Sequence, residues 1–296
     1  MLPDDWHLTQ DVNAFLTRAE DFLRSRPALH NTPLTDIEKL RIRRTTAERD
    51  AEAAVFGRLE SGGEVCAIFY LTPRGRLGLT PLTLKQTDTL AAFLTGLGHS
   101  PSQVIADHDT ASAFAESWQR ATGAASVPFW RTHLYRLGTL TPPQPRPEGQ
   151  GRVTGRQDHE QVVRWCREFC VDVGEQSSID LIDADAWADS RFGDRHFTFW
   201  ETPDGTPVSM AAATSVIGGM VRIDPVYTPA HLRGHGYAGA VTVEASRAAL
   251  TVGATDVVLF TDPDNPTSNA LYQRIGYVHV ADFAGHTFSY AARHRS

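Results

Sequence analysis

Residues 226–240, VYTPAHLRGHGYAGA, form the most informative stretch of the chain. The stretch joins a strand pattern to a long helical pattern over residues 232–252. Gly234 and Gly236 tolerate positive φ and let a ligand approach the backbone closely. The N–H groups of such a loop and of the first helical turn converge where the helix dipole is positive, and Arg233 can add charge. The stretch therefore predicts a strand–loop–helix unit with a pyrophosphate site.

Residues 234–239, GHGYAG, also match the GxGxxG pattern of dinucleotide-binding folds, with Asp256 placed as the acidic residue of that pattern. Two features argue against this alternative. Residues 228–233 separate the strand from the first glycine, and only one strand, one short helix and a terminal hairpin are expected to follow. We therefore prefer the pattern Arg233-x-x-Gly236-x-Ala238, which fits Q/R-x-x-G-x-G/A.

A second motif lies at residues 265–277, NPTSNALYQRIGY. Asn265 and Pro266 fit the N-cap and the first position of a helix. Asn265, Ser268 and Tyr272 follow at i, i+3 and i+7, so they share one helix face. Capping explains the Asn and the Pro but not this polar stripe, which indicates a binding function for the helix.

The two motifs, in this order, resemble the cofactor-binding motifs of the GNAT superfamily of acetyl-CoA-dependent N-acetyltransferases. The resemblance covers roughly residues 152–295. Residues 222–229, RIDPVYTP, are also similar to the strand and exit that precede the pyrophosphate loop in actinobacterial members. An actinobacterial, GC-rich source is consistent with the basic residues, which are almost all Arg.

The resemblance implies a role for each matching residue. The pantetheine arm would hydrogen-bond the backbone of Val226, Tyr227 and Thr228, at the point where this strand splays from the next strand. The pyrophosphate would bind the backbone N–H groups of Arg233, Gly234, His235, Gly236, Tyr237 and Ala238. Asn265 and Ser268 would line the pantetheine path, and Tyr272 would donate to the departing CoA thiolate.

The implied chemistry is direct attack of an amine on the thioester in a ternary complex, where positioning supplies much of the acceleration. A protonated amine must first lose a proton. Glu175 and Asp224 are the principal candidates for the base, with Glu201 and relayed water as alternatives. A backbone N–H of Val226 or Tyr227 would stabilise the oxyanion. A covalent acyl-cysteine is not expected, because neither motif contains Cys.

A proline-rich run at residues 141–151, TPPQPRPEGQG, predicts an extended linker between domains at 1–140 and 152–296. Each half shows helices, an antiparallel meander, and alternating strands and helices. We therefore expect an α/β fold of two GNAT-like domains, each with a mixed, mostly antiparallel central sheet flanked by helices. The first half lacks both motifs, so the resemblance implies a degenerate domain there, as in tandem-GNAT proteins, and a catalytic domain in the second half.

Within the second half, the hydrophobic periodicity predicts helices over residues 158–173 and 183–191. Two closing strands are expected over residues 277–283 and 286–291.

Composition restricts the function further. The chain has 296 residues, 41% of them hydrophobic, which excludes a disordered protein. Its net charge of −7 argues against a nucleic-acid partner and is compatible with a cationic amine. No stretch has the length and apolarity of a membrane span or leader, so we expect a cytoplasmic protein without a membrane partner. Cys66, Cys166 and Cys170 lack zinc-ligand spacing, so no metal is expected.

The resemblance implies an N-acetyltransferase that uses acetyl-CoA as the acyl donor and acts on a primary amine of a small molecule or peptide. The alternative is a non-catalytic acyl-CoA-binding or regulatory protein, and the presence of Tyr272 favours the enzyme. A monomer and a homodimer are both compatible with the sequence.

Overall fold

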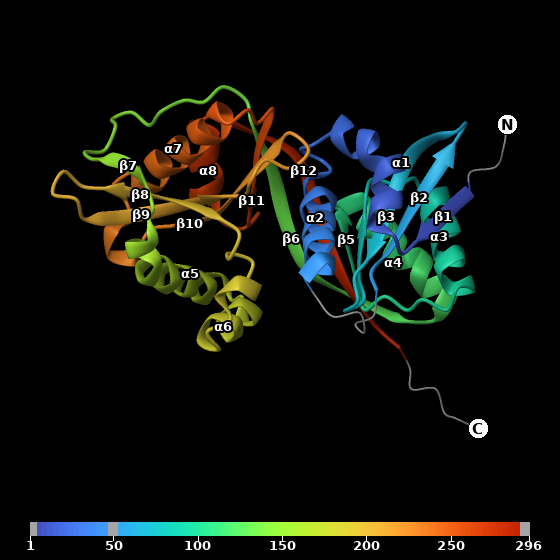
Figure 1. The fold of residues 1–296 in the computed structure, drawn as a ribbon. Helices are drawn as coiled ribbons and strands as arrows, with labels where there is room; N and C mark the ends of the chain where they lie inside the picture. The colour runs from blue at the N-terminus through green and yellow to red at the C-terminus, as the bar shows by residue number, and fades with distance from the viewer. Residues whose placement is uncertain (1–4, 47–52, 291–296) are drawn as a thin grey trace. The chain divides into compact units, whose positions relative to one another are not determined.

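The computed structural model describes residues 5–46 and 53–290, with the side chains of residue 5 and residues 43–46 excepted (Figure 1). The chain divides into two compact units: Met1–Leu134 with Val280–Ser296, and Tyr135–His279. We call them unit 1 and unit 2. The expected boundary at residues 141–151 differs from this division, since the end of the chain groups with unit 1. No helix in the described ranges is long and apolar enough to cross a bilayer.

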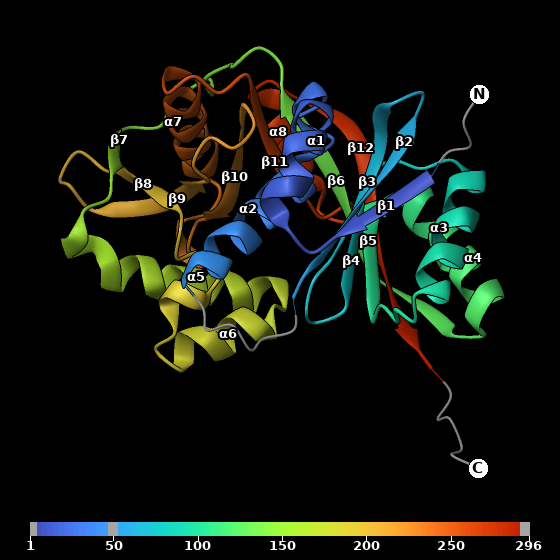
Figure 2. The same ribbon diagram turned by 45° about the vertical axis from the view of Figure 1, so that its right-hand side comes forward.

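Unit 1 has a sheet between two pairs of helices. Figure 2 shows α1 and α2 on one side of its strands and α3 and α4 on the other. Its strands follow the order β1-β2-β3-β4-β5-β12, antiparallel except for β4 with β5. Its elements are β1 (Asp5–Thr9), α1 (Val12–Ser25), α2 (Asn31–Thr46), β2 (Val55–Ser61), β3 (Glu64–Leu71), β4 (Arg76–Leu79), α3 (Leu84–Gly96), β5 (Gln103–Asp107), α4 (His108–Thr122) and most of β6 (Ala125–Leu137).

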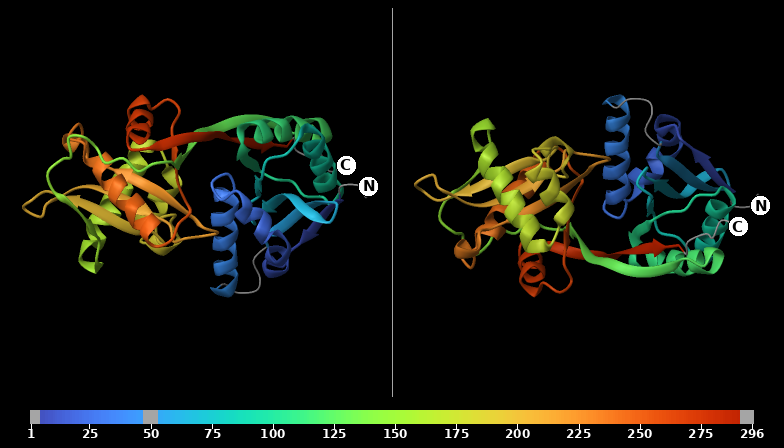
Figure 3. Two further views of the ribbon diagram at one scale, coloured as in Figure 1. Left: turned by 90° about the horizontal axis from the view of Figure 1, so that it is seen from above. Right: turned by 90° about the horizontal axis from the view of Figure 1, so that it is seen from below.

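Unit 2 has the order β11-β10-β9-β8-β7, antiparallel except for β10 with β11. The two views of Figure 3 show α7 over one face of these strands and α5 over the other. Its elements are β7 (Gln150–Val153), α5 (His159–Val173), α6 (Gln176–Asp183), β8 (His196–Glu201), β9 (Pro207–Ala213), β10 (Met220–Tyr227), α7 (Tyr237–Thr251), β11 (Asp256–Thr261), α8 (Pro266–Arg274) and the start of β12 (Tyr277–Ser289).

Alternation along the strands of unit 2 separates two apolar cores. Ala211 faces α7 and packs with Val241, whereas Met210 faces α5 and packs with Trp165. Successive strand residues point to opposite faces, so the neighbouring side chains Met210 and Ala211 of β9 belong to different cores. The predicted mixed sheet flanked by helices is confirmed.

Three predicted elements in unit 2 differ in the structure. The helix expected at residues 183–191 is wrong: α6 ends at Asp183, and Asp185 has a positive φ of 58°, which interrupts a helix. The closing strands form one strand, β12. The long helix begins at Tyr237 rather than at residue 232, because Gly234 and Gly236 adopt left-handed φ angles.

Two cysteines of α5 belong to the core of unit 2. Cys166 and Cys170 are free and buried. Burial raises the pKa of the Cys170 thiol to about 12 and that of Cys166 further above its ordinary range. Both thiols are therefore protonated at neutral pH and are poor nucleophiles.

A buried histidine makes the stability of unit 1 sensitive to acid. His30 is 0% exposed, its Nδ1 lies 3.0 Å from the Leu23 carbonyl oxygen, and its Nε2 has no hydrogen-bond partner among the described residues. Burial lowers the pKa of His30 below its ordinary value of 6.5. Near pH 6 the unfolded chain therefore binds more protons at this residue, and stability falls as the pH drops below about 6.5.

We expect chemical denaturation to show a free energy of unfolding that decreases from pH 7 to pH 5, by at most ~1.4 kcal/mol per pH unit for one proton. His30→Gln should flatten this dependence, and His99→Gln, a substitution at a less buried histidine of unit 1, should retain it. The same slope in wild type and His30→Gln would contradict the assignment.

Candidate active site

The end of β10 separates from its parallel neighbour at the site. Parallel pairing joins Met220–Arg222 to Asp256–Val258 and stops there, while pairing with β9 continues to Tyr227 after a register shift between Ile223 and Val226. Pro225 lies within this shift and offers no N–H to a ladder. The splay expected before Val226 is therefore present in the structure.

The N-terminus of α7 is open to a ligand. Gly234 and Gly236 have φ of +85° and +80°, and Gly236 is an N-cap without a side-chain hydrogen bond. Since the first N–H groups of a helix have no intrahelical acceptor, the backbone of residues 234–238 offers donors at the positive end of the helix dipole, whereas the Arg233 N–H donates to the Ala230 carbonyl oxygen at 3.4 Å. This local geometry suits an anion such as pyrophosphate.

Arg233 does not direct its charge at this N-terminus. Its Nε donates to the Thr228 carbonyl oxygen at 3.0 Å, and its Nη2 donates to Asp172 Oδ2 at 2.5 Å. The side chain therefore fastens the loop to the exit of β10 and to α5. The charge that the sequence led us to expect at the pyrophosphate is paired in the structure.

We expect Gly236→Ala to weaken acetyl-CoA binding about tenfold. A Cβ in the left-handed region costs ~1–2 kcal/mol, and relief of this strain would turn the loop N–H groups away from the ligand. Gly253→Ala is the matched control, because Gly253 has φ of +95° and follows the other end of α7, with no atom within 4 Å of the added Cβ. Both variants should melt lower, but only Gly236→Ala should change the Kd measured by calorimetry; equal Kd values would contradict the assignment.

The equivalent helix terminus in unit 1 is closed. The parallel strands β4 and β5 flank α3, whose N-cap is Thr83. The Thr83 hydroxyl accepts from the Gln86 N–H at 3.3 Å, and Gln86 Oε1 accepts from the Thr83 N–H at 2.9 Å. This capping box occupies donors that an anion would need.

Side chains fix the segment that is expected to contact pantetheine. The hydroxyl of Ser209 donates to the Tyr227 carbonyl oxygen at 3.0 Å and lies 2.8 Å from the Thr228 hydroxyl. The Tyr227 hydroxyl donates to Glu168 at 2.9 Å, and burial together with this carboxylate raises the pKa of Tyr227. Ser209 lies on a different strand, outside both sequence motifs, so the motifs do not predict that it holds this segment in place.

Helix α8 starts as the sequence predicts. Asn265 Oδ1 accepts from the Ser268 N–H at 3.0 Å, and Pro266 is the first helical residue. Asn269, which sequence reasoning missed, donates from Nδ2 to the carbonyls of Asp262 and Asn265 at 3.0 and 2.9 Å. It thereby fixes the loop between β11 and α8; its position four residues after the N-cap was the available signal.

Helices α7 and α8 approach closely at the open N-terminus. A Cβ at Gly239, in the first turn of α7, would lie only 3.8 Å from the side chains of Leu271 and Ile275. Tyr272 occupies the same stretch of α8, so the phenol and the open N-terminus belong to one region of unit 2.

Tyr272 presents a free phenol. Its ring is half-buried against that of Tyr277, with centroids 6.1 Å apart, and no described residue hydrogen-bonds its hydroxyl. Burial, and secondarily the charge of Asp224, raise the pKa of Tyr272. The hydroxyl therefore stays protonated at neutral pH and is available as a donor.

Two predicted carboxylates meet at one arginine. Arg191 Nη1 lies 3.3 Å from Glu175 Oε2, and its Nη2 lies 3.1 Å from Asp224 Oδ1. The guanidinium stacks over the ring of Phe192 at 4.9 Å and also faces that of Phe169. Glu175 and Asp224 come from different elements, and Arg191, which sequence reasoning missed, holds them together.

Glu201 is not part of this cluster. It is buried and accepts from Arg152 Nε at 2.7 Å, and Arg152 also pairs with Asp158 at 2.8 Å. This network joins β7, β8 and the start of α5. Its geometry is that of a structural ion pair, so Glu201 is a poor candidate for the base.

Several solved structures share the fold over nearly the whole chain. A GCN5-related N-acetyltransferase from Sphaerobacter thermophilus is 17% identical, with a TM-score of 0.54 over 97% of this chain and 96% of that one. A Drosophila protein is 14% identical, with a TM-score of 0.59 over 97% and 99%. A tandem GNAT protein from the clavulanic acid biosynthesis pathway is 12% identical, with a TM-score of 0.50 over 96% and 98%. These identities show the fold alone.

Sequence comparison identifies the family of unit 2. No curated protein matches the chain. The model of the Acetyltransferase (GNAT) family matches residues 159–277, which include the open N-terminus of α7, Tyr272 and both carboxylates of the Arg191 cluster. Residues 159–277 of this chain therefore form a GNAT acetyltransferase domain.

Proposed function

We propose that unit 2 transfers an acetyl group from acetyl-CoA to a primary amine of a small molecule or peptide, by direct attack in a ternary complex. The observation that carries the proposal is the protonated Tyr272 phenol, which has no partner among the described residues and lies on the helix that packs against the open N-terminus of α7. A donor in this position suits a departing thiolate.

Acetyl-CoA would lie along the splayed end of β10. In this proposal the N–H groups of residues 234–238 hold the pyrophosphate, the backbone of residues 226–228 holds pantetheine, and Asn265 and Ser268 line its path. A backbone N–H of Val226 or Tyr227 would stabilise the oxyanion. The proposed reaction requires no metal.

The acceptor amine would lie beside the Arg191 cluster, where Glu175 and Asp224 attract a cationic nitrogen. Of the two, we favour Asp224 as the base, because its charge acts on the Tyr272 hydroxyl and it precedes the pantetheine segment. Glu175 also accepts a hydrogen bond from the Ser178 hydroxyl, which ties it to α6.

Unit 1 would be a GNAT-like domain without a cofactor, since the capping box of Thr83 and Gln86 closes α3. We propose a cytoplasmic monomer or homodimer, with neither nucleic acid nor membrane as partner.

One observation favours a second function. Both candidate bases are paired with Arg191, as expected if unit 2 binds acyl-CoA without turnover. This alternative is a regulatory or carrier protein that keeps the cofactor site.

Release of CoA thiol, screened over classes of amine with mass spectrometry of the products, separates the two functions. We expect acetylated amine with equimolar CoA, and calorimetry should give one acetyl-CoA per chain. Tight binding without CoA release for any amine would support the regulatory alternative, and two equivalents bound would contradict the role assigned to unit 1.

A further inference from the structure

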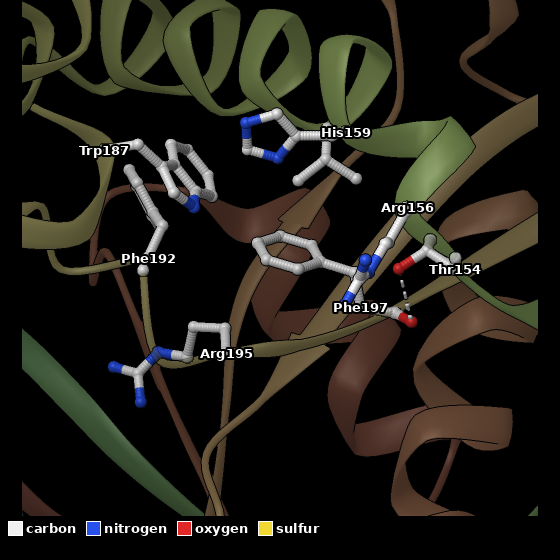
Figure 4. A pocket seen from close by; sticks show the side chains of 10 residues that line it. Thr154, Arg156, His159, Trp187, Phe192, Arg195 and Phe197 are labelled. Atoms are coloured by element: carbon white, nitrogen blue, oxygen red, sulfur yellow. Dashed lines mark hydrogen bonds between the residues drawn. The ribbon is translucent and has the colours of Figure 1, made fainter. Parts of the chain in front are cut away.

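A pocket of about 710 Å³ lies outside the groups assigned above to acetyl-CoA and to proton transfer. Its lining comes from unit 2 alone: residues 154–156, the start of α5, the turn that contains Trp187, and the segment that leads into and begins β8. Figure 4 shows the rings of His159, Trp187 and Phe197 around a common space. This volume and aromatic lining suit an apolar part of a small molecule.

Arg195 lines this pocket and also contacts Asp224 of the Arg191 cluster. Its side chain is 4% exposed, and its closest carboxylate contact joins Nη2 to Asp224 Oδ2 at 3.9 Å, which is beyond hydrogen-bond distance. Figure 4 shows its guanidinium extending past Phe192 and away from Arg156. Arg195 therefore lies between the aromatic space and the proposed base.

Two nitrogens of the Arg195 guanidinium, other than the Nη2 that faces Asp224, have no hydrogen-bond partner among the described residues. These nitrogens are Nε and Nη1, and both are buried. A buried donor without an acceptor destabilises the folded state, and a charged donor does so most strongly. Unpaired donors of this kind therefore indicate an acceptor that the bound ligand supplies. An anionic oxygen is the acceptor that a guanidinium binds most strongly.

We infer that the acceptor is an α-amino acid with an apolar or aromatic side chain. The inference rests on the proposed function. The substrate carboxylate binds Arg195, its amino group lies toward Asp224, and its side chain occupies the aromatic pocket. The 3.9 Å between Arg195 and Asp224 sets a cation and an anion side by side, complementary to the adjacent carboxylate and ammonium of an amino acid. A singly charged carboxylate suits this site better than a phosphate dianion, which Asp224 would repel.

The reaction balances without a further reagent. The substrate ammonium loses one proton to the base, which passes it to solvent, and the neutral nitrogen then attacks the acetyl carbon. As the amide bond forms, the nitrogen loses a second proton, the C–S bond of the thioester breaks, and the departing thiolate takes the Tyr272 proton. The second proton from the nitrogen replaces it on Tyr272. The products are an N-acetylated amino acid and CoA.

The test compares three acceptors that differ only at the carboxylate: L-phenylalanine, L-phenylalaninamide and 2-phenylethylamine. We expect kcat/KM for L-phenylalanine to exceed that of the other two by at least tenfold. Calorimetric titration of L-phenylalanine into the CoA-saturated protein should show binding that 2-phenylethylamine lacks, a readout that is independent of turnover.

Arg195→Gln should reduce this preference to near one, and Arg195→Lys should restore part of it. Arg164→Gln is the matched control, because Arg164 is an exposed arginine of α5 outside the pocket lining, and it should retain the full preference. If Arg195→Gln does not fold, the wild-type acceptor series still decides the question.

Failure of the inference and failure of the proposed function give different results. Equal kcat/KM for the three acceptors, with CoA release, would overturn the amino-acid assignment and leave the acetyltransferase intact. CoA release from no amine would contradict the acetyltransferase, and binding of L-phenylalanine in that case would still support the Arg195 site.

Discussion

Tyr272→Phe is expected to lower kcat by about a hundredfold while the Kd for acetyl-CoA stays within twofold of wild type. The substitution removes one hydroxyl and keeps the ring that packs against Tyr277. Because the hydroxyl has no hydrogen-bond partner among the described residues, its loss should leave no buried group unsatisfied and should change the melting temperature little. A positioned proton donor typically contributes 10²–10⁴-fold.

Stopped-flow and steady-state measurements of CoA thiol release would show the fall in kcat, and calorimetry would show the unchanged Kd for acetyl-CoA. Tyr290→Phe is the control: it removes a phenol hydroxyl from unit 1, where Tyr290 bonds Trp118 and the Pro101 carbonyl. This control should cost stability and leave kcat unchanged. A kcat for Tyr272→Phe equal to wild type would remove Tyr272 from the mechanism.

The sequence is most informative where a single residue type determines the backbone. Only glycine adopts the positive φ of positions 234 and 236 without a cost in free energy, so the open N-terminus of α7 can be inferred from these two glycines alone. Asn265 and Pro266 similarly fix the start of α8, because their capping chemistry is local. These signals need no knowledge of the rest of the fold.

Contacts between distant segments could not be predicted in this way. The position of Arg233 in the motif predicts a contact with phosphate, but its guanidinium forms an ion pair with Asp172 on α5. Glu175 and Asp224 were each plausible as isolated carboxylates, and nothing local indicates that Arg191 joins them. An ion pair depends on the tertiary path of both partners, which periodicity does not contain.

The end of the chain shows the same limit at the level of the fold. The pattern after residue 277 predicts two strands and a hairpin within the second domain, whereas β12 continues, and residues 283–287 pair with β5 of unit 1. Alternation of side chains identifies a strand but not the partner with which it pairs. The division of the chain at residues 134 and 279 follows from that partner.

Asp224→Asn is expected to lower kcat for an aliphatic amine by about a hundredfold, because a general base contributes on this scale. The amide keeps the shape of the carboxylate and one acceptor for Arg191, and it cannot take a proton. The effect should depend on the acceptor: benzylamine must lose a proton before it attacks, whereas aniline is already neutral at pH 7.5.

We therefore expect the defect of Asp224→Asn to shrink to less than tenfold with aniline. Glu175→Gln is the matched variant, since it removes the other carboxylate of the same arginine, and it should cost less than tenfold with either amine. Rates of CoA release for the two amines in the three proteins give the comparison. Equal losses in both variants, or a loss with aniline as large as with benzylamine, would show that the carboxylates hold Arg191 in place and that the proton leaves by another route. Both amines lose a proton as the amide forms, but only benzylamine must also lose one before it attacks, and that earlier step is the one assigned to Asp224.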